Sequence, residues 1–394
     1  MTHSVHVSAR GAKRLKSGHP WVFANEIKES VRDLPAGGTV DVHAPTGGFI
    51  GRGYANAKSL IAIRLLTRSK RQDIDDAQFY IAKLRSALSY RERVYPDRQS
   101  LRLVHAEGDG LPGLVIDRYG DALAVQLTTL GMECRKEVLQ EALNVVFKPS
   151  GAVLRNDSAV RKLEGLPLER TDWFGDVPES VDVDEFGVKF RIALHAGQKT
   201  GHFFDQADNR RFAGSLCKGG RVLDVYANTG GWALHALHNG AKEAIVVDKS
   251  ESTCGLAAAN ADLNGFSDQM QVINDEGKKT LQYMVSAGER FDAVVLDPPA
   301  FAKTKKVVQS ALRGYTEINA LGLTLVRPGG FFFPSSCSYH VSEEDYLRTV
   351  HTAALEVGRT LRIVRRGQQS ADHPVVPGIP ETRYLKSFAI HVTT

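Results

Sequence analysis

The chain has 394 residues, of which 42% are hydrophobic and 24% charged, a composition typical of an ordinary protein with two or three domains. No apolar run approaches the roughly 20 residues of a membrane span, and the first residues lack the apolar core of a signal peptide, so we expect no membrane association and a cytoplasmic location. Cys134, Cys217, Cys254 and Cys337 form no CxxC pair, which argues against a disulfide framework and a zinc site.

Positive charge is concentrated at the front of the chain. Residues 1–70 carry eleven Lys and Arg against four Asp and Glu, a net charge of +7, whereas the remainder carries −2. This asymmetry predicts a contact with a polyanion at the front, with a merely solvated basic face as the alternative.

Short strand-like runs separated by Gly-rich turns predict a small β-barrel over residues 1–70. The runs are 21–23, 39–42, 48–51 and 60–66. Lys13 and Arg14 precede a Gly-His-Pro-Trp turn, and this front segment resembles a PUA domain, a compact barrel that recurs in RNA-modifying enzymes. The resemblance implies that Lys13 and Arg14 contact RNA phosphates.

Residues 73–180 change character and predict a small α+β domain. A helical pattern over 73–95 is followed by strands at 101–105, 113–117 and 121–128, a helix at 132–146 and a strand at 151–155. No residue here suggests catalysis, so we assign the domain to scaffold and substrate shaping.

From residue 187 to 394, strands and helices alternate, which predicts a Rossmann-like α/β domain with a parallel, doubly wound sheet. The predicted strands are 222–225, 244–248, 271–273, 291–296 and 331–333. The predicted helices are 206–217, 231–239, 251–263, 277–287 and 307–326.

Acidic residues at the ends of these strands suggest a nucleoside ligand. Asp224 opens a Gly-containing turn that includes Tyr226, Asn228 and Gly230, and Asp248 ends the next strand, where an acid accepts from ribose hydroxyls. The glycine spacing departs from G-x-G-x-x-G and no P-loop lysine is present, so S-adenosylmethionine fits better than a ligand with a pyrophosphate. Asp275, after the third strand, stands where an adenine amino group would bind.

The fourth strand ends in Asp297-Pro298-Pro299-Ala300-Phe301. Prolines stop the strand and leave Asp297 at its carboxyl end, where open α/β sheets bind ligands. Acid-Pro-Pro-aromatic motifs occur in methyltransferases that act on planar, nitrogen-bearing substrates, which makes Pro298, Pro299 and Phe301 candidates for substrate binding. Cys337 follows the next strand in polar surroundings, unlike the other three cysteines, and is a candidate nucleophile.

Three motifs together resemble the ribosomal RNA large subunit cytosine-C5 methyltransferase I family: 223–226 with Thr229-Gly230-Gly231, 297–301, and Ser335-Ser336-Cys337-Ser338. Segments 199–201, 205–206, 209–210, 372–374 and 384–386 match it too, while His202, Ala207 and 274–276 depart from its pattern. The resemblance covers essentially the whole chain.

The resemblance implies methylation of carbon 5 of a cytosine in 23S ribosomal RNA, with S-adenosyl-L-methionine as cofactor and without a metal. Cys337 would attack carbon 6, and Asp297 would handle the ring nitrogen N3. The implied cofactor contacts are Lys199, Thr200, Arg210, Asp224, Tyr226, Asn228, Gly230, Asp248 and Asp275. The sequence fixes neither the target nucleotide nor the oligomeric state, so a homodimer is left open.

Three other functions remain open at this point. An amino-group RNA methyltransferase would use the same Asp-Pro-Pro-aromatic stretch without a nucleophile. A DNA-directed enzyme is disfavoured by the PUA-like front. An RNA-binding protein that keeps the sheet only as scaffold would not bind S-adenosylmethionine.

Overall fold

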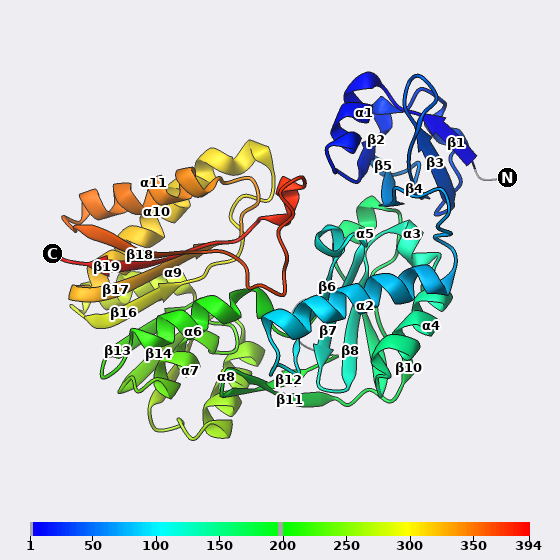
Figure 1. Cartoon of the computed structure of the whole chain (residues 1–394). Helices are drawn as coiled ribbons and strands as arrows, with labels where there is room; N and C mark the ends of the chain where they lie inside the picture. The colour runs from blue at the N-terminus through cyan, green and yellow to red at the C-terminus, as the bar shows by residue number, and fades with distance from the viewer. Residues whose placement is uncertain (1–2, 196–199) are drawn as a thin grey trace. The chain divides into compact units, whose positions relative to one another are not determined.

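The computed structural model describes residues 3–195 and 200–394, which form two compact units (Figure 1). The first unit contains Met1–Val183, Ile192–Phe204 and Asp372–Thr382, and the second contains Asp184–Arg191, Asp205–Ala371 and Arg383–Thr394.

The front of the first unit is a five-stranded sheet in the order β1-β3-β4-β5-β2, packed on one short helix. Its elements are β1 (His3–His6), α1 (Ala9–Lys16), β2 (Trp21–Phe23), β3 (Thr39–His43), β4 (Phe49–Ala55) and β5 (Ile61–Thr67). The sequence did not predict α1, which begins where the Ser8 hydroxyl accepts the Gly11 N–H and which buries Leu15 in the core of this sheet.

A second five-stranded sheet, in the order β10-β9-β8-β7-β6, forms the rest of the first unit. Its elements are α2 (Ala77–Val94), β6 (Leu101–His105), β7 (Leu114–Tyr119), β8 (Ala122–Leu127), α3 (Leu130–Glu133), α4 (Lys136–Phe147), β9 (Gly151–Asn156), α5 (Val160–Leu163) and β10 (Glu169–Gly175). The helix predicted from residue 73 begins at Ala77, because the Asp76 side chain caps it by accepting the Gln78 N–H. The strands β11 (Ser180–Glu185) and β12 (Val188–Ala193) then pair as a two-stranded sheet.

The second unit is a seven-stranded sheet with helices on both faces. Its elements are α6 (Ala207–Ser215), β13 (Arg221–Val225), α7 (Gly231–His238), β14 (Glu243–Asp248), α8 (Glu251–Leu263), β15 (Met270–Asn274), α9 (Gly277–Ser286), β16 (Phe291–Leu296), α10 (Val308–Leu325), β17 (Val326–Ser336), α11 (Glu343–Glu356), β18 (Leu361–Gly367) and β19 (Lys386–Val392).

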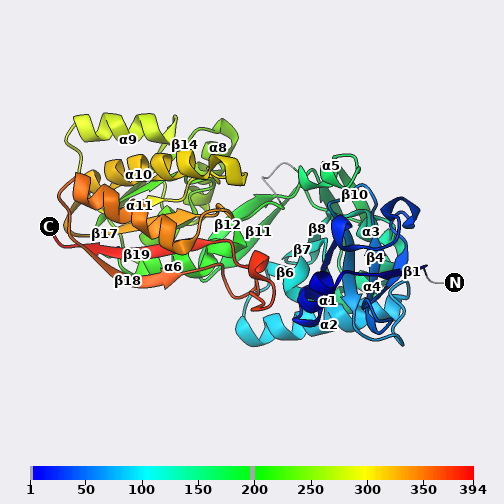
Figure 2. The ribbon, with the colours of Figure 1, turned by 90° about the horizontal axis from the view of Figure 1, so that it is seen from above.

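The strand order of this sheet is β15-β14-β13-β16-β17-β19-β18. The first five strands are mutually parallel, and β19 is inserted antiparallel between β17 and β18. Figure 2 shows α10 between α9 and α11, and α10 contacts both of them. The predicted Rossmann-like α/β fold, preceded by a PUA-like domain and a small α+β domain, is confirmed, with α11, β18 and β19 as elements that the sequence analysis did not assign.

Two short segments group differently from the predicted domains 1–70, 73–180 and 187–394. Ile192–Phe204 and Asp372–Thr382 belong to the first unit. There the His202 N–H donates to the Tyr119 hydroxyl at 3.0 Å, and the Asp372 carboxylate accepts the Arg102 N–H at 2.9 Å. The predicted domain boundaries therefore remain a proposal about which parts of the chain fold independently. In the described part of the chain, no helix is both long and apolar enough to cross a bilayer.

Candidate active site

The register of the parallel strands brings four of the predicted residues to one edge of the second unit. Asp224 lies opposite Val295 of β16, and Leu296 of β16 lies opposite Pro334 of β17. Asp297 follows β16 directly, Asp248 ends β14 and Cys337 follows β17, so all three lie at carboxyl ends of parallel strands in the run β14-β13-β16-β17. Asp224 lies inside β13, one residue before the strand ends, as in the predicted strand 222–225.

Two donors hold the carboxylate of Asp297. Gln206 Nε2 and Trp232 Nε1 both donate to Oδ2, at 3.0 and 3.2 Å, and Asn209 orients Gln206 by donating to its side-chain oxygen at 2.7 Å. Burial raises the pKa of Asp297 to about 6, although the bond from Trp232 acts in the opposite direction. Asp297 is therefore a carboxyl group that exchanges a proton close to neutral pH.

The hydroxyl of Tyr315, on α10, joins the loop after β16 to the loop that carries Cys337. It accepts the Phe301 N–H at 3.4 Å and the Ser336 hydroxyl at 2.9 Å, which leaves its own proton for Ser338 Oγ, 2.9 Å away. The Ala302 N–H donates to the same Ser338 oxygen at 3.0 Å. One buried tyrosine thus fixes the Asp-Pro-Pro loop and the cysteine loop to each other.

Ring stacking reinforces this connection. The Phe301 ring stacks on the Tyr315 ring with centroids 4.5 Å apart and planes 19° from parallel. Pro298 is buried, whereas Pro299 is exposed and Cys337 is partly exposed. Pro299 and part of Cys337 are therefore accessible from the solvent.

A buried cation also contacts the cysteine loop. Lys386, the first residue of β19, lies opposite Ser336 of β17, and its ammonium donates to the carbonyls of Ser338 at 2.6 Å and Val341 at 2.9 Å. Burial lowers the pKa of Lys386 to about 8, while electrostatic interaction with Cys337 acts to raise it.

Asp224 is fully buried and only half satisfied. Its Oδ2 accepts the Ala233 N–H at 3.1 Å, and among the described residues its Oδ1 has no hydrogen-bond partner. Burial raises the pKa of Asp224 to about 7, and the nearby carboxylate of Asp297 adds to this effect, whereas the Ala233 N–H and Arg210 act in the opposite direction. An unsatisfied carboxylate oxygen of this kind is suited to a cationic or N–H-bearing ligand.

The turn after β13 adopts a backbone that side chains seldom take. Tyr226, Asn228 and Gly230 all have positive φ, of 65°, 52° and 79°. The Asn228 N–H donates to Asp248 Oδ2 at 2.9 Å, which ties this turn to the end of β14. Tyr226 lies against Gly277, where an added Cβ would come within 2.8 Å of its ring. The turn and Asp248 thus form one rigid surface.

Two other predicted cofactor contacts of this unit are already ion-paired. Arg210 is buried and makes two bonds to Glu185, at 2.8 and 2.7 Å, and Glu185 also contacts His235 Nε2 at 3.0 Å. Asp275 is partly exposed and pairs with Lys279 at 2.9 Å. The ion pair of Arg210 with Glu185 is buried inside the unit. A contact of Arg210 with the methionine carboxylate of the cofactor remains a prediction.

Four predicted residues do not belong to the described part of the second unit. Lys199 lies outside the described residues, and Thr200 belongs to the first unit, where its hydroxyl donates to Asp117. Arg14 pairs with Glu26 and donates to the Trp21 carbonyl at 2.8 Å, so it holds the local turn together. Lys13 is exposed on α1.

The structure adds four residues to the predicted set: Gln206, Trp232, Tyr315 and Lys386. Gln206 and Lys386 lie in segments that match the family pattern, so the sequence could have indicated them as site residues. Trp232 and Tyr315 lie in helices, and only packing reveals that they face the strand ends.

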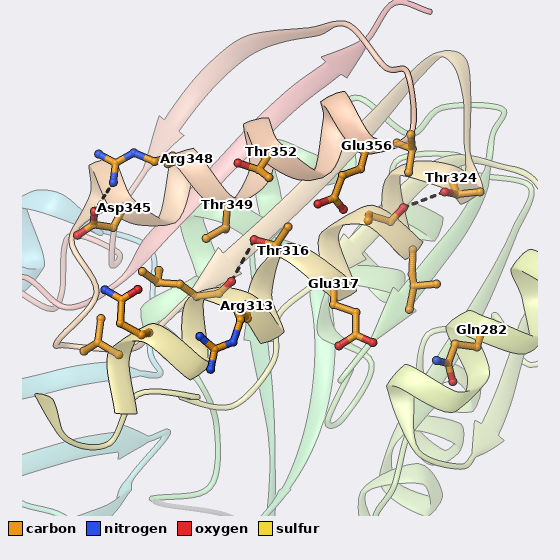
Figure 3. Close-up of a pocket in the computed structure, with 16 residues that line it drawn as sticks. Gln282, Arg313, Thr316, Glu317, Thr324, Asp345, Arg348, Thr349, Thr352 and Glu356 are labelled. Atoms are coloured by element: carbon orange, nitrogen blue, oxygen red, sulfur yellow. Dashed lines mark hydrogen bonds and ion pairs between the residues drawn. The ribbon is translucent and has the colours of Figure 1, made fainter. Parts of the chain in front are cut away.

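A groove of about 750 Å³ lies elsewhere on this unit (Figure 3). It runs along α10 and α11, and its lining mixes charged residues such as Arg313, Glu317 and Arg348 with threonines. It includes none of the predicted site residues. In the described ranges, no three His, Cys, Asp or Glu side chains gather as a metal site would require.

Comparisons with known proteins match both halves of the chain. A PUA-like domain model covers residues 5–68, and a model of S-adenosylmethionine-dependent methyltransferases covers residues 101–380. The chain is 37% identical over 397 residues to the ribosomal RNA large subunit methyltransferase I of Aliivibrio fischeri, with 100% of each chain covered, and 38% identical over 396 residues to that of Tolumonas auensis, with 99% of each covered. The crystal structure of SMU.776 complexed with SAH has the same fold, with a TM-score of 0.85 at 20% identity over 99% of this chain and 100% of that one.

Proposed function

Because the chain belongs to the ribosomal RNA large subunit methyltransferase I family, which depends on S-adenosylmethionine, we propose that it methylates carbon 5 of a cytosine in 23S ribosomal RNA through a covalent adduct with Cys337. The observation that carries this proposal is the joining of the Asp297 loop and the Cys337 loop by the Tyr315 hydroxyl. A nucleophile and an acid fixed at one strand edge suit attack on a planar ring that needs activation.

The residues at the ends of β13 and β14 fit the cofactor. The buried Asp224 Oδ1 lacks a partner among the described residues and suits the ammonium group of the methionine moiety. Asp248 suits the ribose hydroxyls, Asp275 the adenine amino group, and the turn of Tyr226 to Gly230 allows close approach to the backbone. Bound S-adenosylmethionine supplies an electrophilic methyl group to the activated ring.

Cys337 supplies the activation. Carbon 5 of cytosine is a weak nucleophile, and addition of the Cys337 thiolate to carbon 6 converts carbon 5 into an electron-rich, enamine-like centre. After methylation, loss of the proton on carbon 5 restores the double bond and releases the thiolate. Fixation of the cysteine loop by Tyr315 and Lys386 keeps the sulfur in one position during both steps.

Asp297 handles the ring nitrogen. Negative charge develops towards N3 when the thiolate adds, and a protonated carboxyl at that position stabilises it. With a pKa of about 6, Asp297 carries a proton in a useful fraction of molecules near neutral pH. Because Gln206 and Trp232 both engage Oδ2, we assign the proton to Oδ1.

The remaining predicted contacts concern the RNA. A stacked cytosine must be extruded to reach a pocket, at a cost of a few kcal/mol. Backbone phosphates gripped by the basic front of the chain, including Lys13, would offset part of that cost. Pro298, Pro299 and Phe301 would then line the space beside the base. A cytoplasmic location remains a prediction.

The decisive experiment measures transfer of a labelled methyl group from S-adenosylmethionine to large-subunit ribosomal RNA, followed by nucleoside analysis. We expect 5-methylcytidine, and near-total loss of transfer in Cys337→Ala. The control is Cys134→Ala, which removes an exposed thiol of the first unit and should stay active.

Two outcomes would overturn the proposal. N4-methylcytidine or a methylguanosine, with activity kept in Cys337→Ala, would show an amino-group methyltransferase. Intact RNA binding without S-adenosylmethionine binding in calorimetry would show an RNA-binding protein that lacks the activity.

A further inference from the structure

Lys386 is placed beside the cysteine loop by the sheet itself. β19 runs antiparallel to β17, and the pairs Ser335 with Ser387 and Ser336 with Lys386 are the last of that ladder. The next residue of β17 would be Cys337, so the lysine side chain leaves the sheet where the cysteine loop begins. The insertion of β19 therefore delivers a cation to this loop from a distant part of the sequence.

Two hydrogen bonds fix the ammonium group there. Lys386 Nζ donates to the carbonyls of Ser338 at 2.6 Å and Val341 at 2.9 Å, and the residue is only 6% exposed. These carbonyls belong to the turn that follows Cys337. Burial of a lysine costs free energy, which two short bonds to carbonyls only partly offset. If the only role of Lys386 were to hold the turn, a neutral donor could make the same two hydrogen bonds at a lower desolvation cost.

One of the groups that interact electrostatically with the Cys337 thiol is a cation, Lys386. Tyr315 from α10 and Tyr346 from α11 both interact with Cys337, and burial raises the pKa of each, so both are neutral near pH 7. Asp297 also faces Tyr346.

Lys386 itself faces two more charged groups besides the thiol, Arg383 and Glu343. Glu343 is already paired with Arg366 at 2.7 Å and with Arg383, so its charge is compensated. Lys386 thus interacts with a carboxylate whose charge is shared with two arginines and with a thiol that becomes an anion on ionisation.

We propose that Lys386 is a positioning residue for Cys337, whose ammonium both fixes the turn after the cysteine and stabilises its thiolate before the RNA arrives. The inference rests on the proposed function only in taking Cys337 as the nucleophile. Lys386 remains mostly protonated at pH 7, because its pKa is about 8. A cation close to a thiol stabilises the thiolate and lowers the pKa of the thiol by about one unit or more.

The test is the pH dependence of alkylation of Cys337 by iodoacetamide in the full chain, without RNA, quantified by mass spectrometry of the cysteine peptides. In the wild-type protein, the midpoint should lie below the roughly 8.5 of an ordinary thiol. Lys386→Gln keeps a donor for the two carbonyls but removes the charge, and it should move the midpoint upward by about one pH unit. Lys386→Arg keeps a cation and should move it less.

Two controls accompany the measurement. Cys134, an exposed thiol of the first unit, is alkylated in the same sample and should keep its midpoint in every variant. Lys303→Gln removes the same charge from an exposed position after the Asp-Pro-Pro loop and should leave the Cys337 midpoint unchanged.

The outcomes separate this inference from the proposed function. If the Cys337 midpoint is unchanged in Lys386→Gln, Lys386 has only a structural role. If the lysine variants do not fold, a wild-type midpoint at or above about 8.5 would lead to the same conclusion. A shifted midpoint together with full methyl transfer by Cys337→Ala would instead overturn the proposed function and leave the lysine–thiolate interaction standing.

Discussion

The indole N–H of Trp232 donates to the carboxylate of Asp297 at 3.2 Å, so a residue at the start of α7 opposes the effect of burial on the pKa of an acid at the end of β16. This bond stabilises the charged form of Asp297 and lowers its pKa. Trp232→Phe removes the donor, and the limb of the pH profile of kcat/KM near pH 6 should move upward by about one unit. Trp173→Phe, in the first unit, is the control. A limb that stays in place would show that Asp297 does not titrate during catalysis.

Tyr315→Phe should separate the effect of the hydroxyl from that of the ring. The stack on Phe301 survives this change, whereas the bonds to Ser336 and Ser338 are lost. We expect a loss of about 1–3 kcal/mol in stability, because buried partners are left unsatisfied, and a fall of at least tenfold in kcat. Tyr283→Phe, at an exposed position on α9, should change neither quantity. Normal kcat in Tyr315→Phe would mean that the two loops are fixed by other contacts.

The raised pKa of Asp224 predicts that the stability difference between the wild-type protein and Asp224→Asn depends on pH. Its folded pKa of about 7 lies above the unfolded value of about 3.9, so the folded chain holds more protons between these values and loses stability as the pH rises through them. Asp224→Asn cannot titrate. Relative to wild type, the variant should therefore gain about 2 kcal/mol between pH 5 and pH 8 in urea unfolding. Parallel curves for the two proteins would contradict the raised pKa.

Gly277→Ala should weaken cofactor binding without touching a cofactor contact directly. The added Cβ would lie 2.8 Å from the Tyr226 ring and force it to move. Overpacking of this kind costs about 1–3 kcal/mol in folding stability. Because the displaced ring belongs to the turn proposed to contact the cofactor, the Kd for S-adenosylmethionine in calorimetry should also rise, by about tenfold. Gly255→Ala, where the added carbon meets nothing within 4 Å, should bind normally. Equal affinities for the two variants would remove Tyr226 from the cofactor site.

Lys13 and Arg14 are neighbours with different expected roles. Lys13→Gln should weaken RNA binding and lower the slope of log affinity against log salt by about one, without loss of stability. Arg14→Gln leaves Glu26 without its partner and should lower the free energy of unfolding by about 1 kcal/mol. Thermal unfolding and filter binding over a salt series check both changes. The proposal for Lys13 fails if its variant keeps the wild-type salt slope.

The sequence predicted the elements whose pattern is local. The alternation from 222 to 333 located four of the five parallel strands to within one residue, whereas β17 is much longer than the predicted 331–333 and begins at Val326. The residues that end or follow these strands, Asp248, Asp297 and Cys337, lie at the predicted edge. β18 escaped prediction because it is an edge strand with mostly exposed side chains, rich in arginine, which does not show the apolar run of a buried strand.

The helical partners of the site could not be predicted in the same way. The position of Tyr315 within α10 fixes which face it occupies, but only the packing of α10 on the sheet determines that its hydroxyl meets Ser336 and Ser338. Arg210 illustrates the converse. Its place near a matched segment suggested a ligand contact, whereas Glu185, on a preceding strand, occupies its guanidinium.

The place of β19 in the sheet has a consequence for how the second unit assembles. β18 is synthesised before β19 but lies outside it, so neither strand can complete the sheet until the chain has been made to the end of β19 at Val392. Until then β17, with the cysteine loop at its tip, is an unpaired edge, a known hazard for association with other chains. A nascent chain that ends between Cys337 and Lys386 would therefore contain the cysteine but lack β19, the strand that pairs with β17. The strand that pairs with β17 also carries Lys386, so closure of the sheet and completion of the cysteine loop depend on the same segment.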